Sequence, residues 1–199
     1  VLFLMLAILL LLSGCFAVSV NPIYTTQDTI SDDAFLGYWV QMPFDEYFPM
    51  SLTVEKEPND EYGYNLTVYK DGIANVFLAH LVKLDQKLYL DCYPQTDVLM
   101  ENMNSFMTFH LVKVHSIAEI TIDQNRLELR FLSNDLLKYV ILREKLQLKY
   151  TVIPEWDEQV LLTGSTAEVQ ELIKQYSEEL FSSDAPDQFE RAQNPFEQG

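Results

Sequence analysis

The chain has 199 residues, of which 48% are hydrophobic and 13% aromatic, a composition typical of a globular domain with one well-buried core. Its formal charge of −17 excludes nucleic-acid binding, because affinity for a polyanion comes from clusters of Lys and Arg, and 13 such residues face 30 acidic ones here. Two cysteines, Cys15 and Cys92, do not make a disulfide framework, so stability has to come from packing.

An apolar run from Val1 to Leu12 is followed by Ser13-Gly14-Cys15. With Leu12, these residues match a lipobox, so residues 1–15 resemble a bacterial lipoprotein signal. The run is shorter than the roughly 20 residues of a spanning helix and fits a signal peptide. The resemblance implies cleavage of residues 1–14, attachment of diacylglycerol to Cys15, and acylation of the new amino terminus by a fatty acid such as palmitate. We therefore expect a lipid anchor at the bacterial cell envelope, and Phe16 after the cysteine favours the outer membrane if the source is Gram-negative.

The next segment, residues 15–33, is polar, contains Pro22 and has no sustained period, so it predicts a lipidated tether. Ordered structure is expected from about Asp33. Beyond it, apolar and polar residues alternate, which is typical of antiparallel strands, with turns at Asp71-Gly72 and Asp85-Gln86. The expected strands cover 51–55, 62–68, 76–84, 87–93, 106–114, 118–122, 126–131 and 146–152, with a short helix at 134–143 capped by Asn134.

A closed barrel is the simplest fold for these strands, because it buries one face of each and leaves no open edge. We therefore predict a mainly β domain over 34–181, an antiparallel up-and-down barrel of about eight strands. A helix follows: Ser165 and Glu168 form a capping box ahead of an apolar stripe that runs to Leu180, and this stripe should pack on the barrel. Residues 182–199 show little periodicity and predict a disordered tail.

The sequence Leu36-Gly37-Tyr38-Trp39, the meander of hairpins and the late helix resemble the lipocalins and uncharacterised lipocalin-like bacterial lipoproteins. In that family a Gly-x-Trp motif opens the first strand, and Gly37 and Trp39 match it. The resemblance implies that Trp39 plugs the closed end of the barrel under an arginine from near the last strand. Arg143 and Arg130 are the candidates for this arginine.

The same resemblance implies a cup for a small apolar ligand, with a lid after the first strand. Phe44, Tyr47 and Phe48 are the aromatic residues of this lid segment. We expect the cavity to be lined by residues such as Trp39, Tyr64, Leu66, Leu78, His80 and Leu90. The alternative is that these side chains fold inward and fill a small barrel. Of the whole set, Trp39, Phe44, Tyr47, Phe48, Tyr64 and His80 are our candidate ligand-binding residues.

Catalytic and metal-binding patterns are weak in this sequence. His80, His110 and His115 do not share a strand face, so we expect no metal site. Cys92 alternates with Leu88 and Leu90 and is expected to be a buried apolar residue. We find no Gly-x-Ser-x-Gly elbow, no Cys/His pairing, no phosphate loop and no dinucleotide fingerprint, and therefore expect neither an enzyme nor a cofactor.

The sequence thus predicts a membrane-anchored lipoprotein that binds or shuttles a small apolar ligand at the cell envelope. The alternative is a filled barrel that acts as an interaction or structural module and meets an envelope protein through its outer surface or its acidic C-terminal segment. The membrane, through the lipid on Cys15, is the one partner common to both.

Overall fold

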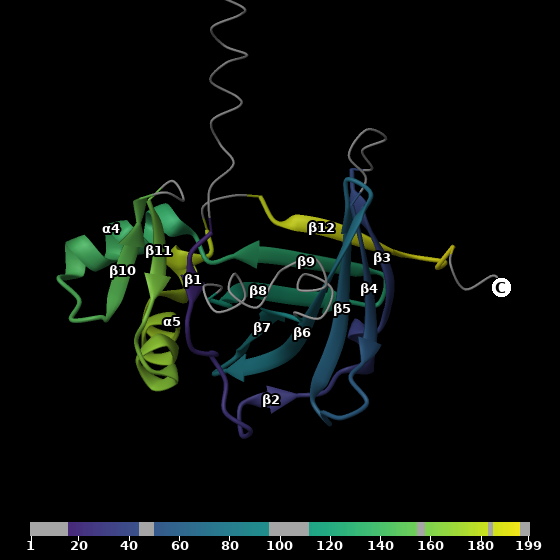
Figure 1. Cartoon of the computed structure of the whole chain (residues 1–199), viewed down its shortest axis with the longest axis horizontal. Coiled ribbons are helices and arrows are strands. Elements are labelled where there is room, and N and C mark those ends of the chain that lie inside the picture. The colour runs from purple at the N-terminus through teal and green to yellow at the C-terminus, as the bar shows by residue number, and fades with distance from the viewer. Residues whose placement is uncertain (1–15, 44–49, 96–111, 155–157, 183–184, 196–199) are drawn as a thin grey trace, which may run out of the picture.

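A closed antiparallel barrel of eight strands is the centre of the structure, a computed structural model that describes residues 16–43, 50–95, 112–154, 158–182 and 185–195 (Figure 1). The predicted fold class is confirmed. The barrel strands are β3 (Gly37–Met42), β4 (Met50–Lys56), β5 (Gly63–Lys70), β6 (Ile73–Leu84), β7 (Lys87–Pro94), β8 (His115–Asp123), β9 (Arg126–Phe131) and β12 (Asp187–Ala192). Consecutive strands pair as a meander, and β12 closes the ring between β9 and β3.

Two tight turns place the hairpins where the sequence predicts them. Asp71 and Gly72 join β5 to β6 with φ values of 54° and 76°, and Asp85 lies at φ 54° between β6 and β7. Asp and Gly tolerate this left-handed backbone better than most residues. The local sequence therefore determines these two connections.

The strands β6, β7 and β8 are apolar on both faces, because the protein has two hydrophobic cores. The barrel interior is one, and it includes Trp39, Leu66, Leu90 and Phe189. The second lies outside the wall, where the outward residues of β6–β8 meet two helices and β11 (Gln159–Leu162). Its members are Ala17, Ile23, Val82, Leu84, Tyr89, Ile117, Leu132, Leu137, Val140, Ile141, Val160, Leu162, Val169, Leu172, Ile173, Leu180 and Phe181.

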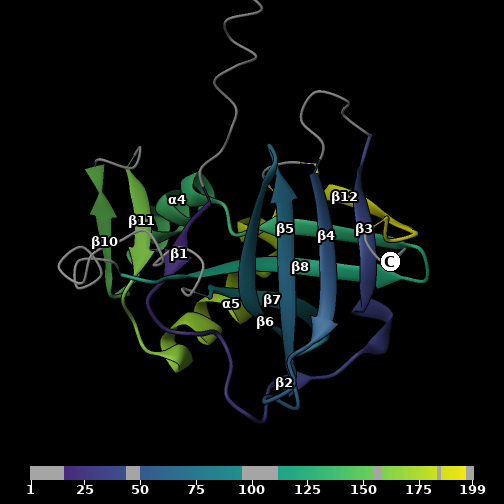
Figure 2. The ribbon, with the colours of Figure 1, turned by 45° about the vertical axis from the view of Figure 1, so that its right-hand side comes forward.

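The helix α5 (Thr166–Leu180) has the predicted capping box, with Ser165 and Glu168 each accepting from the other's backbone amide. It packs on the outer barrel wall as expected, and Figure 2 shows it beside β7 and β6. The shorter helix α4 (Asn134–Glu144) is capped by Ser133 rather than by Asn134, whose side chain instead accepts a hydrogen bond from the Val160 amide.

Residues 16–33 are part of the folded domain, so the predicted start of order near Asp33 is wrong. This segment forms β1 (Val18–Ser19), β2 (Thr29–Ile30) and the short helix η1 (Asp33–Phe35). Strand β1 lies between β8 and β11, β2 pairs with β6, and Ile23 is buried between them. Two-residue strands have no readable period and depend on tertiary partners for their hydrogen bonds, which is why the sequence pattern missed them.

The C-terminal segment is also ordered in its described part, which corrects the prediction of a disordered tail over 182–199. Strand β12 pairs with β3 from Gln188 to Ala192 and with β9 from Asp187 to Glu190. Phe189 lies in the barrel interior with no exposed surface. Phe189 is the one large apolar residue of β12, so the strand shows no apolar alternation. The strand forms because the edges of β3 and β9 both need a hydrogen-bonding partner.

Two other strands differ from the prediction. Expected strand 106–114 lies largely outside the described residues, and residues 112–114 are not in a strand. Expected strand 146–152 is reduced to β10 (Tyr150–Ile153), which pairs with β11 as the outermost strand of a side sheet. Among the residues described, no helix has the length and apolar character to cross a membrane.

Candidate functional site

The barrel has two unlike ends, which we call the open end and the closed end. In a meander, alternate connections meet at one end, so β3–β4, β5–β6, β7–β8 and β9–β12 are joined at the open end. The other connections meet at the closed end, with η1 beside them. Any ligand of the interior has to enter where the barrel is not plugged, so the contents of each end decide what the interior can bind.

Trp39 plugs the closed end. Its side chain is fully buried, and its Nε1 donates to the carbonyl oxygen of Phe35 at 3.0 Å. The guanidinium of Arg191 covers the indole, with its central carbon 4.2 Å from the ring centroid. Arg191 also donates to the carbonyl oxygens of Ala34 at 2.6 Å and Gln124 at 3.1 Å, so it ties η1 to the β8–β9 turn.

The arginine that stacks on Trp39 is therefore Arg191, not Arg143 or Arg130 as expected. Arg191 lies directly across from Trp39 in the β12–β3 ladder, so both side chains point to the same face. Arg143 lies on α4 and pairs with Glu144 and Glu179 at the surface. Arg130 lines a cavity outside the barrel. The sequence pattern does not indicate Arg191 as the stacking arginine, because residues 182–199 show too little periodicity to predict a strand there.

Gly37, the first residue of the Gly-x-Trp motif, has a physical reason to be glycine. Its φ of +127° is a conformation that other residues rarely adopt, and a Cβ there would lie 2.6 Å from the Nη1 atom of Arg191. The Arg191 guanidinium passes over this position to reach the carbonyl of Leu36 at 2.5 Å. Glycine at position 37 therefore leaves room for the Arg191 side chain, and it also begins the first barrel strand.

The interior is filled around Trp39, and partly exposed apolar side chains lie at both of its ends, with Leu36, Leu88 and Ile122 at the closed end. Around Trp39, the side chains of Phe35, Tyr64 and Phe189 have no exposed surface. Further along the same inward faces, apolar side chains are only partly buried: these are Met50, Val68, Phe77 and Phe131. A polar pair accompanies them, because Gln41 lies on the same face of β3 as Trp39 and donates to Asp187 at 3.2 Å.

Of the expected cavity residues, Trp39, Tyr64, Leu66 and Leu90 belong to the interior core. Phe44, Tyr47 and Phe48 lie outside the described residues. Leu78 and His80 correct the prediction, because they face outward. Leu78 and His80 lie on the outer face of β6. This face is apolar like a core face because α5 and residues 16–30 cover it from outside the barrel.

A network of histidines and carboxylates lies on this outer wall. Nε2 of His80 is 2.8 Å from Oδ2 of Asp60, and Nδ1 of His115 is 2.6 Å from Oδ1 of Asp91. His80 and Asp91 are direct neighbours across β6 and β7. Burial raises the pKa of Asp60, but hydrogen bonds from His80 and from backbone amides, with the charge of His80, outweigh it and leave the pKa below its usual range.

This network fastens the N-terminal segment to the barrel. The amide of Ile23 donates to Asp91 Oδ2 at 2.9 Å, and the ring of Tyr24 stacks on His80 with centroids 4.3 Å apart. His110 lies outside the described residues. Within the described part of the chain, no group of three or more His, Cys, Asp or Glu side chains is placed to hold a metal ion. The arrangement holds residues 16–30 against the outer wall of the barrel.

Tyr24 should make the free energy of unfolding depend on pH in the alkaline range. Burial, followed by the charges of Asp91 and Asp60, raises the pKa of its phenol from 10.0 to about 12. A raised pKa contributes stability that is complete below pH 10 and is lost as the pH rises toward 12. After allowance for partial exposure, the free energy of unfolding should fall by about 1–2 kcal/mol more in the wild type than in Tyr24→Phe across this range. Denaturant titrations at pH 9 to 12 check this, and parallel curves for the two proteins would contradict it.

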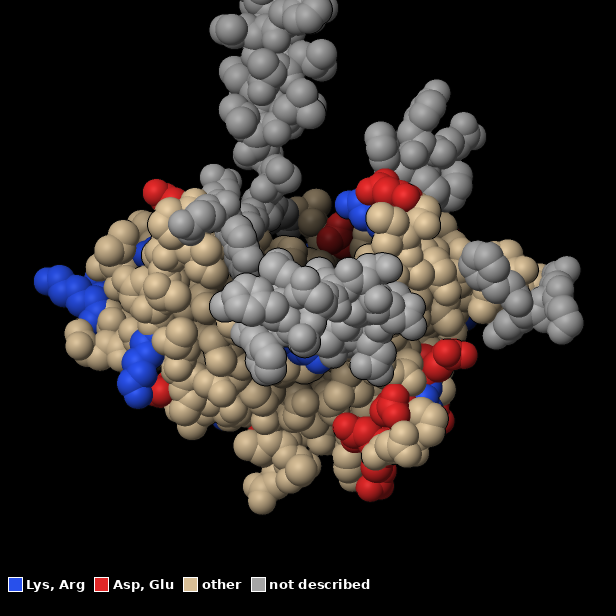
Figure 3. All heavy atoms as spheres, viewed as in Figure 1, with Lys and Arg blue, Asp and Glu red and all other residues tan. Residues whose placement is uncertain are grey.

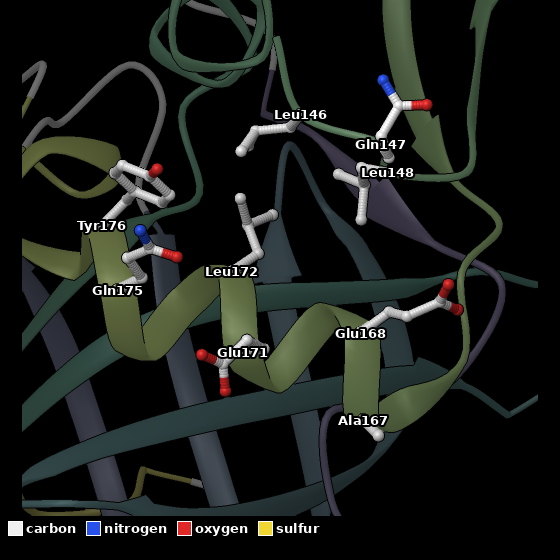
Figure 4. Close-up of a pocket in the computed structure, with 9 residues that line it drawn as sticks. All are labelled: Leu146, Gln147, Leu148, Ala167, Glu168, Glu171, Leu172, Gln175 and Tyr176. Atoms are coloured by element: carbon white, nitrogen blue, oxygen red, sulfur yellow. The ribbon is translucent and has the colours of Figure 1, made fainter. Parts of the chain in front are cut away.

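Two surface cavities lie outside the barrel. One, of about 370 Å³, is a groove between α5 and the segment before β10 (Figure 4). The side chains of Leu146, Leu148 and Leu172 converge there, while Glu171 points away. The other, also about 370 Å³, is polar and lies between β7–β9 and the end of α5, where Lys87 pairs with Glu119 and Glu178.

Cys92 is buried in the interior core, as predicted. Burial, with a smaller contribution from the charge of Asp91, raises the pKa of its thiol far above the ordinary value. The thiol is therefore protonated at neutral pH and is shielded from reagents, which excludes it as a nucleophile.

Comparison with family models, with curated proteins and with solved structures finds no significant match to this chain.

Proposed function

We propose that this protein is a lipid-anchored barrel that binds a small apolar ligand in the open half of its interior, and that the anchor is the acylated Cys15 at the bacterial cell envelope. The observation that carries the proposal is the difference between the two halves of the interior. Trp39 under Arg191, with Phe35, Tyr64 and Phe189 around it, plugs the closed half, whereas near the open end partly exposed apolar side chains line the inward faces. Partly exposed apolar side chains inside a barrel are a suitable lining for an apolar guest.

The lining also limits the ligand class. Met50, Val68, Phe77 and Phe131 offer aliphatic, thioether and aromatic contacts, and thioethers adapt to guests of variable shape. The Gln41–Asp187 pair is the polar group on the inward faces of the neighbouring strands β3 and β12. We infer a ligand with an apolar chain or ring and one group that donates a hydrogen bond.

Native mass spectrometry with organic extraction tests this function. The protein would be purified from its own host with Cys15→Ser, so that the anchor lipid is absent and any bound mass belongs to the interior. Val68→Trp fills the open half, and Thr67→Trp adds the same side chain one residue earlier, on the outer face. We expect a reproducible bound molecule in the parent and in Thr67→Trp, and at least about a tenfold loss of occupancy in Val68→Trp.

An unliganded mass in all three proteins, or a ligand retained by Val68→Trp, would contradict the carrier function. Thermal unfolding of each variant shows whether the barrel is intact, so that loss of ligand is not confused with loss of fold.

The second candidate function is an interaction module that uses the outer surface. Its support is the side sheet, where β10 is the outermost strand and carries exposed Tyr150 and Val152 next to the apolar groove of Figure 4. An exposed strand edge can pair with a strand of another protein. The same mass spectrometry decides between the two, because an empty barrel that retains a protein partner supports this module.

A further inference from the structure

We infer that the open end of the barrel lies against the lipid bilayer and that its apolar rim contacts the membrane, so that the ligand enters from the lipid phase. This inference rests on the lipid anchor of the proposed function and goes further, because it fixes the orientation of the barrel. Three independent observations support it: where the anchored chain joins the domain, which residues form the rim, and where the acidic residues lie.

The chain joins the domain at the open end. Phe16, which follows Cys15 directly, stacks on Phe131 at the last position of β9, with ring centroids 5.1 Å apart. The amide of Ala17 donates to Leu132 at 2.8 Å, and Gln159 donates to the carbonyl oxygen of Phe16 at 2.7 Å. In Figure 1 the first described residues and the tips of β3, β4 and β5 lie toward the same side of the molecule. A lipid on Cys15 therefore has no flexible tether and holds this end close to the membrane.

Large apolar side chains are exposed on the rim of the same end. Met42 ends β3 at 37% exposure, Ile73 begins β6 at 61%, and Val112 precedes β8 at 67%. Phe16, at 39%, is a fourth member of this open-end rim. These four residues are far apart in the sequence, but the up-and-down topology brings all of them to one end of the barrel. Exposed apolar residues that gather in this way are typical of a surface that another apolar phase covers.

The closed end is acidic. Exposed carboxylates lie on η1, at the ends of β4 and β8, in the β4–β5 connection and in the turn after β6: Asp33, Glu55, Asp123, Glu61 and Asp85. Figure 3 shows acidic side chains gathered over the lower ends of β4 and β5, and at the open end the β5–β6 turn carries the opposite charges of Lys70 and Asp71. Anionic headgroups repel such a surface, so a chain with a net charge of −17 is best placed on a membrane with this end outward.

The orientation of the barrel indicates that its ligand comes from the membrane. A barrel mouth against the bilayer receives molecules that reside there, so the ligand class is a membrane lipid or another acyl-chain amphiphile. Such a molecule has the apolar chain that Met50, Val68 and Phe77 can contact, and a polar group for the Gln41–Asp187 pair.

Site-directed spin labelling of the full-length lipidated protein in phosphatidylcholine vesicles tests the orientation. Cys15 is acylated and Cys92 is buried, so an introduced thiol is the one that reacts. The nitroxide is placed at the rim with Ile73→Cys or Met42→Cys, at the closed end with Gln86→Cys, and on α4 with Leu142→Cys. Leu142 is the apolar control, because it is 74% exposed but lies on α4 and not in a barrel connection.

We expect the ratio of accessibility to oxygen over accessibility to an aqueous nickel chelate to be several-fold higher at both rim positions than at Gln86 and Leu142. Equal ratios at the four positions, or a higher ratio at Gln86 or Leu142, would overturn the orientation. Co-flotation with the vesicles and the mass of the acylated N-terminus are measured on the same samples. A protein that floats but gives equal ratios refutes the orientation alone, whereas a protein without acyl chains refutes the anchor.

Discussion

Replacing Phe189 by alanine is expected to lower the free energy of unfolding by about 3–5 kcal/mol, the usual effect of truncating a fully buried phenylalanine. Phe189 is the side chain by which β12 enters the interior core, and β12 closes the barrel between β3 and β9. Its loss leaves a cavity beside Trp39 and weakens the pairing of two strand edges together. Chemical denaturation monitored by circular dichroism measures the change.

Glu190 is the control for this prediction, because it follows Phe189 on the same strand and is exposed. Glu190→Ala should change the free energy of unfolding by no more than about 0.5 kcal/mol. If Phe189→Ala were as stable as Glu190→Ala, β12 would not be part of the folded barrel, and the closed architecture would fail with it.

Gly37→Ala is expected to destabilise the fold by at least about 2 kcal/mol, since backbone strain of this kind costs roughly 1–3 kcal/mol before any contact is lost. The new methyl group would also displace the Arg191 guanidinium, which lies 2.6 Å from the Cβ position, and so disturb the cover over Trp39. Thermal and denaturant unfolding measure the loss, and near-ultraviolet circular dichroism, to which the buried Trp39 contributes, reports the change in its surroundings.

A double-mutant cycle separates the two causes. If the contact with Arg191 matters, Gly37→Ala should cost clearly less in an Arg191→Ala background than in the wild type. Gly72→Ala is the comparison for backbone strain alone, because Gly72 also has a positive φ but nothing lies within 4 Å of its Cβ position. Strict additivity of Gly37→Ala and Arg191→Ala would show that the arginine does not explain the glycine.

The two halves of the barrel interior suggest a division of work between stability and binding. Trp39, Arg191 and Phe189 form a packed plug toward the closed end. Near the open end, Phe77 and Val68 are only partly buried, so under the proposed function substitutions there should affect ligand occupancy more than stability. Variants at the two ends therefore test different properties of the same core.

Much of the fold could be predicted from local patterns. The period-two alternation of β4 to β9, the Asp71-Gly72 turn and the Ser165–Glu168 capping box each depend on residues close together in the sequence, and the structure confirms them. The Gly-x-Trp motif likewise placed Trp39 at the start of the first barrel strand. Strand faces, left-handed turns and helix caps are determined by residues that are close together in the sequence, so the sequence alone can predict them.

The tertiary structure alone decided which residues meet. It placed Arg191 over Trp39, a pair separated by 152 positions in the sequence, through the register of β12 against β3. It also decided which face of β6 is the interior, since both faces are apolar and His80 is buried outside the barrel under Tyr24. A local pattern shows that a strand has a buried face. It cannot show whether that face lies in the barrel interior or is covered by helices and loops outside the wall. The short strands β1, β2 and β12 exist because neighbouring strands supply their hydrogen-bond partners, and no property of their own few residues requires them.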